Sequence, residues 1–98
     1  MKTINQGRPR SSYFVAFNPP DTTVAIDEEI VCIHPRNNEK TKAICVDLFT
    51  QVWDQLPDSF CLLQYGCIAR DLRTAIETTY PDVKTSTEVR FLLLREIQ

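Results

Sequence analysis

Apolar residues recur at steps of three and four between residues 40 and 56. The set includes the single tryptophan and comprises Cys45, Leu48, Phe49, Val52, Trp53 and Leu56. On an α-helix this spacing gathers the side chains into one stripe that faces a core. Asn37 or Asn38 can cap such a helix, and Pro57 disfavours helical geometry in the residue before it. The pattern therefore predicts a helix over residues 40–56.

A second helical pattern covers residues 60–79. The apolar positions at helical spacing are Leu62, Tyr65, Ala69, Leu72 and Ile76. Asp58 or Ser59 provides a cap at the start, and the sequence Tyr80-Pro81-Asp82 ends the helix. Gly66 can divide the segment into a short turn and a longer helix.

Residues 11–17 and 89–97 have the composition of strands. The first segment is rich in aromatic and β-branched residues, and the turn-forming residues 18–21 close it. The second is apolar on both faces in its middle. That pattern is typical of a central strand covered on both sides, or of a strand paired across a dimer.

Residues 22–34 carry two short apolar runs on either side of the acidic residues 27–29. They form either one long strand with an exposed acidic middle, or two short strands with a hinge or bulge at the acids. A continuous strand would place Glu28 on the same face as Ile26 and Ile30. We therefore favour the hinged arrangement.

The order of these elements, β-β-(β)-α-α-β, predicts an α+β fold. In it, a small, mainly antiparallel sheet of three to four strands carries two helices packed on one face. Residues 1–10 are expected to form a flexible basic arm, because Gly7 and Pro9 oppose regular structure. Residues 11–98 have the length of a single domain. Open strand edges and a poorly covered sheet face favour a homodimer.

The composition is that of a folded domain, with 43% hydrophobic and 24% charged residues. A formal net charge of −2 gives no overall attraction to nucleic acid or to an anionic membrane. No apolar run approaches the roughly 20 residues that a membrane-spanning helix needs. The basic start of the chain has no apolar stretch behind it, so we expect a cytoplasmic protein without a secretory signal.

Four cysteines lie within apolar segments, where they are expected to be buried free thiols: Cys32, Cys45, Cys61 and Cys67. A zinc site formed by these residues with His34 is an alternative, although they lack the closely spaced ligand pairs of structural zinc sites. Cys61 is also a candidate nucleophile with His34, because the start of a helix lowers a thiol pKa. His34 is the only histidine. Because it precedes a proline, we favour a polar residue that ends a strand over a catalytic or metal-binding role.

Catalytic motifs are absent, and the only two glycines form no phosphate-binding loop. We therefore expect a non-enzymatic interaction or regulatory domain, without cofactor or metal, that binds another protein and forms a homodimer. The alternative is a nucleic-acid-binding protein that uses the basic arm and the start of the first helix. Its candidate contacts are Lys2, Arg8, Arg10, Arg36, Lys40 and Lys42, with Tyr13 as a ring for base stacking.

Overall fold

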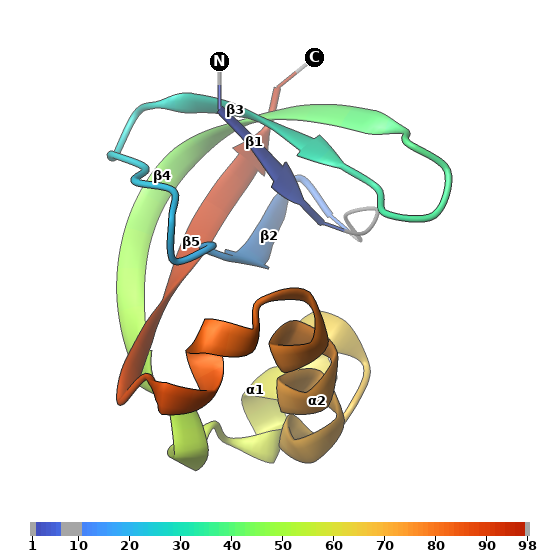
Figure 1. The fold of residues 1–98 in the computed structure, drawn as a ribbon. Helices are drawn as coiled ribbons and strands as arrows, with labels where there is room; N and C mark the ends of the chain where they lie inside the picture. The colour runs from blue at the N-terminus through green and yellow to red at the C-terminus, as the bar shows by residue number, and fades with distance from the viewer. Residues whose placement is uncertain (1, 7–10, 98) are drawn as a thin grey trace. The chain divides into compact units, whose positions relative to one another are not determined.

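The structure of the protein is a computed structural model that describes residues 2–6 and 11–97. The chain divides into two compact units (Figure 1). The sheet unit comprises Met1–Phe49 and Arg90–Gln98, and the helical unit comprises Thr50–Val89. The single domain expected for residues 11–98 stays a prediction.

The strands form one mixed sheet of five, in the order β1-β3-β4-β5-β2. Their bounds are Lys2–Asn5 for β1, Tyr13–Phe17 for β2, Glu29–Ile33 for β3, Lys40–Val52 for β4 and Glu88–Glu96 for β5. Strand β1 pairs with β3 in parallel, whereas β3 with β4 and β5 with β2 are antiparallel. The α+β class is confirmed, but the sheet has more strands than the three or four expected.

The prediction of a helix over residues 40–56 is wrong, because residues 40–52 form the long strand β4 and residues 53–55 form a short 3-10 helix. Cys45 and Leu48 both pack against the core of the sheet unit although they are three residues apart. Strand alternation therefore shifts by one residue between them, as at a β-bulge. The carboxylate of Asp47 accepts a hydrogen bond from the Leu48 N–H at this point. The shift produces the spacing of three that imitates a helix.

The two helices both come from the single segment expected over residues 60–79. Helix α1 spans Asp58–Tyr65 and helix α2 spans Ala69–Thr79. Gly66 separates them with a φ of 74°, a left-handed conformation that glycine adopts without steric cost. A further 3-10 helix spans Pro81–Thr85. The packing of the helices on one face of the sheet stays a prediction.

Residues 22–34 contain one strand and not two. Strand β3 begins at Glu29, and the earlier apolar run has no regular structure although its Val24 is buried. Asp27 lies between them with a φ of 71°, a region that aspartate tolerates better than most residues. The break at the acidic residues is therefore present, but a single strand follows it.

Residues 2–5, expected within a flexible arm, instead form strand β1, and Ile4 is buried in the core. Residues 1 and 7–10 of the expected arm lie outside the described residues. The Lys2 Nζ lies 3.0 Å from a carboxylate oxygen of Glu28 and also donates to the carbonyl of Thr23. These contacts tie the edge strand to the turn before β3.

Glu28 is expected to make the stability of the protein depend on pH. The Ala25 N–H donates to its carboxylate at 2.9 Å, and with Lys2 this holds the pKa of Glu28 below its ordinary value. The stabilisation is therefore complete above the ordinary pKa and is lost as the pH falls through the lowered one. In thermal melts we expect Glu28→Gln to lower the midpoint at neutral pH and to match the unchanged protein in acid. An equal difference at every pH would contradict this role.

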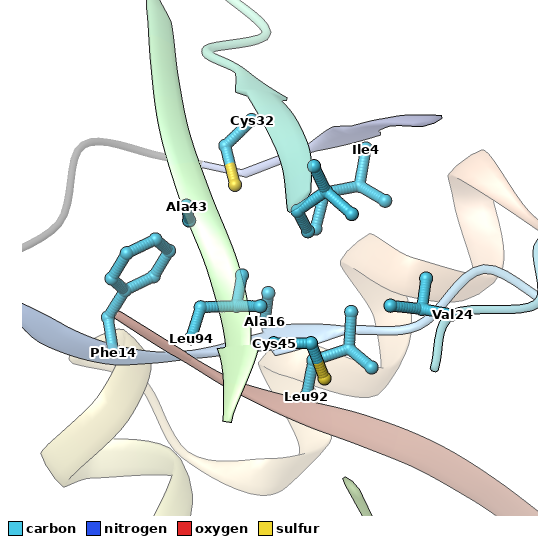
Figure 2. Close-up of a cluster of buried hydrophobic side chains, with 10 residues drawn as sticks. Ile4, Phe14, Ala16, Val24, Cys32, Ala43, Cys45, Leu92 and Leu94 are labelled. Atoms are coloured by element: carbon cyan, nitrogen blue, oxygen red, sulfur yellow. The ribbon is translucent and has the colours of Figure 1, made fainter. Parts of the chain in front are cut away.

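Ten buried side chains form the core of the sheet unit (Figure 2). They come from all five strands and the turn before β3: Ile4, Phe14, Ala16, Val24, Ile30, Cys32, Ala43, Cys45, Leu92 and Leu94. Successive strand residues point to opposite faces of a sheet, so their neighbours along each strand lie on the other side. We call that other side the outward face.

Candidate nucleic-acid interface

Two lysines of β4 lie on the outward face. Ala43 and Cys45 belong to the core, so Lys40 and Lys42 point the other way by alternation. Both lysines are exposed, and they pair across the sheet with Ile33 and Val31 of β3. Each long cationic side chain therefore extends from a rigid strand, with a half-buried apolar residue beside it.

Arg95 and Tyr13 lie on the same outward face. Leu94 belongs to the core, so the next residue of β5, Arg95, points outward and is exposed. Tyr13 of β2 is its direct partner in the antiparallel register, and 54% of the tyrosine is exposed. Directly paired residues share a face, so the arginine and the aromatic ring are neighbours.

Hydrogen bonds at two ends show that β4 and β5 are antiparallel neighbours. The Ile97 N–H donates to the Lys42 carbonyl at 3.0 Å, and the Trp53 N–H donates to the Thr87 carbonyl at 2.9 Å. The first bond brings the end of β5, two residues beyond Arg95, beside Lys42. Lys40, Lys42, Arg95 and Tyr13 therefore occupy one continuous part of the outward face, which we call the basic face.

The turn between β3 and β4 adds Arg36 near the basic face. The His34 N–H donates to the Glu39 carbonyl at 2.8 Å and closes the turn. The Nδ1 of His34 accepts a hydrogen bond from the Arg36 N–H at 3.1 Å. Asn38 adopts a φ of 60°, which asparagine tolerates. The histidine ring thus supports the turn, and the Arg36 side chain is exposed.

The cationic side chains on and beside the basic face form no ion pairs with acidic side chains of the described residues. Within residues 2–6 and 11–97, the only ion pairs are Lys2 with Glu28 and Arg70 with Asp71. The cations Arg36, Lys40, Lys42 and Arg95 therefore have no acidic partner in the described chain. Glu29 is the one acidic residue on the outward face of β3, and it pairs with Ile44. The charge of the basic face is thus positive, in contrast to the formal charge of −2 for the whole chain.

The structure keeps three of the six expected nucleic-acid contacts together. Lys40 and Lys42 share the basic face and Arg36 lies on the adjoining turn, although they do not mark the start of a helix. Lys2 is already paired with Glu28. Arg8 and Arg10 lie outside the described residues.

Sequence reasoning did not include Arg95 among the candidate contacts. The signal was the alternation along residues 89–97, which sends Arg95 away from Leu94. Only the register between β2 and β5 shows that Arg95 lies opposite Tyr13.

The expected thiol site receives no support from the electrostatics of Cys61. The cysteine is fully buried in α1, and burial, followed by the nearby charges of Cys67 and Asp58, raises the pKa of its thiol. The lowering expected from the start of a helix is therefore wrong. His34 belongs to the sheet unit and Cys61 to the helical unit. Their pairing as nucleophile and base stays a prediction.

Cys32, Cys45 and Cys61 are buried as expected, whereas Cys67 is only half-buried, and all four are free thiols in the structure. Burial raises the pKa of Cys32 to about 12. In the described part of the chain, no three His, Cys, Asp or Glu side chains lie close enough together to hold a metal ion. The zinc site considered from the cysteines and His34 is therefore not assembled.

Comparison with protein-family models, with characterised proteins and with solved structures gives no match for this chain. Among the described residues, no helix has the length and apolar character needed to cross a membrane.

Proposed function

We propose that this protein is a non-enzymatic binding domain that holds single-stranded nucleic acid on the basic face. The observation that carries the proposal is the grouping of three exposed, unpaired cations with an exposed aromatic ring on one sheet face. Lysine and arginine bind phosphate groups, and a tyrosine ring stacks on a base. The strands fix the backbone that carries these groups, so only the side chains need to be ordered on binding.

The aromatic ring favours a single strand over a duplex. A base can stack on Tyr13 only when its own face is free, and in a duplex both faces are covered by neighbouring base pairs. The cations contact the backbone and carry no sequence information. Because the whole chain has a negative net charge, the attraction between the basic face and the phosphate groups is local. Because it depends on phosphate contacts, it is strongly weakened by salt.

Tyr13→Ala is expected to weaken binding of a fluorescently labelled single-stranded oligonucleotide. Loss of one stacked base costs about 1–3 kcal/mol, which is roughly a 5- to 150-fold loss of affinity. Fluorescence anisotropy measures this directly, and circular dichroism checks that the variant is folded.

Tyr13→Phe is the matched control, because it removes the hydroxyl and keeps the ring. We expect it to bind nearly as well as the unchanged protein. Equal binding by the alanine variant, or the absence of salt-dependent binding by the unchanged protein, would defeat the proposal.

A second candidate function is binding of a protein partner through α1, a surface separate from the strand edges and sheet face on which a homodimer is expected. The observation that favours it is a pair of exposed leucines, Leu62 and Leu63, of which Leu63 is 75% exposed. Adjacent exposed apolar residues on a helix can enter the groove of a partner. Two residues form a small contact, so this candidate stands behind the basic face.

A further inference from the structure

The segment between α1 and α2 runs back along α1. Helix α1 ends where the Gly66 N–H donates to the Leu62 carbonyl at 3.1 Å, which is a left-handed C-cap. Three residues later, the Ala69 N–H donates to the Asp58 carboxylate at 2.8 Å. The chain therefore returns from the last turn of α1 to its first residue within residues 66–69.

Cys67 lies on this returning segment and is carried past Cys61. Residues three apart share a face of a helix, so Cys61 lies on the same side of α1 as Asp58, to which Ala69 is bonded. The residue that follows a left-handed cap, here Cys67, commonly contacts a side chain in the last turns of the helix, where Cys61 lies. In agreement, the charges of Cys67 and Asp58 both contribute to the raised pKa of Cys61.

The other two cysteines are held apart by the sheet. Cys32 pairs with Thr41, and the Cys45 N–H donates to the Glu28 carbonyl. The two thiols are thus offset by four residues along the paired strands, about 13 Å. A disulfide needs Cα atoms within about 7 Å, so Cys32 and Cys45 cannot be joined in the folded protein.

We propose that Cys61 and Cys67 form an oxidisable dithiol that a low-molecular-weight disulfide converts into an intramolecular disulfide tying α1 to the segment before α2. With glutathione disulfide, the half-buried Cys67 thiolate attacks one sulfur, and the S–S bond breaks. One glutathione leaves and takes up the proton that Cys67 lost. The Cys61 thiolate then attacks the Cys67 sulfur, and the second glutathione leaves with the proton of Cys61. Two protein thiols are oxidised and one glutathione disulfide is reduced to two glutathiones.

The reaction is expected to be slow and to accelerate with pH. Burial raises the pKa of both Cys61 and Cys67, so only a small fraction of each is the reactive thiolate near neutral pH. That fraction rises as the pH approaches the raised pKa. The pair is therefore a slow redox switch and not a catalytic dithiol.

Peptide mapping after oxidation of the folded protein tests the proposal. The protein is incubated with glutathione disulfide, unfolded with iodoacetamide to trap the remaining thiols, and digested with chymotrypsin, which cuts after Tyr65 between the two cysteines. We expect an intact mass that has lost two hydrogen atoms before trapping, and alkylation at Cys32 and Cys45 only. The fragments that carry Cys61 and Cys67 should separate only after reduction.

Cys67→Ser should abolish the disulfide, whereas Cys32→Ser is the matched control and should form it as the unchanged protein does. Glutathione that remains on Cys67 without transfer to Cys61 would overturn the proposal, as would pairing that involves Cys32 or Cys45. Persistence of four free thiols at alkaline pH would overturn it as well.

Discussion

Replacing Trp53 with alanine is expected to lower the free energy of unfolding by about 3–5 kcal/mol, because it leaves a large cavity. Trp53, which belongs to the helical unit, is only 3% exposed. Its Nε1–H donates to a carboxylate oxygen of Glu77 at 2.8 Å, which joins the residue after β4 to helix α2. The Trp53 N–H also donates to the Thr87 carbonyl. The tryptophan therefore connects three parts of the helical unit.

Trp53→Phe separates the contribution of the buried ring from that of the hydrogen bond to Glu77. Phenylalanine keeps much of the ring volume but leaves the part-buried Glu77 carboxylate without its donor, which costs about 1–3 kcal/mol. Urea unfolding followed by circular dichroism measures both variants, since neither retains the fluorescent tryptophan. A nearly neutral alanine variant would contradict the buried position of the ring.

Neutralising all three cations of the basic face is expected to weaken nucleic-acid binding strongly and to reduce its dependence on salt. The variant is Lys40→Gln, Lys42→Gln and Arg95→Gln. Each phosphate contact with a single strand contributes about 0.7 to the slope of log affinity against log salt, so the slope should fall by about 2. At about 0.1 M salt this corresponds to roughly 100-fold weaker binding. Anisotropy titrations over a range of salt concentrations give both quantities.

A charge-matched control comes from the helical unit. Replacing Arg70, Arg73 and Lys84 with glutamine changes the net charge by the same amount but leaves the basic face intact. We expect a small change in affinity and no change in the salt slope. An equal loss in the two triple variants would show that net charge, and not the basic face, controls binding.

The sequence identified the fold class because its periodic patterns are local. Residues 60–79 have an unambiguous helical repeat, and both helices form there, divided at Gly66. Residues 40–52 carry two competing patterns: alternation from Lys40 to Cys45, followed by a spacing of three created by the bulge before Leu48. Only the pairing with β3 decides between helix and strand, and pairing depends on residues distant in the chain.

The candidate site was predictable only in part for the same reason. Lys40 and Lys42 stood out as a local cluster even though the element that carries them was misassigned. The neighbourhood of Tyr13 and Arg95 depends on a register between strands at opposite ends of the chain. The ion pair of Lys2 with Glu28, which is 26 residues away, depends equally on the fold and was not visible in the local sequence.

An NMR titration of the isotope-labelled protein with a single-stranded oligonucleotide tests the proposed interface most directly. We expect the shifted backbone amides to cluster at Tyr13, at residues 40–42 and at Arg95, and the shifts to weaken as salt is added. Shifts centred on Leu62 and Leu63 of α1, or no shifts at low salt, would contradict it.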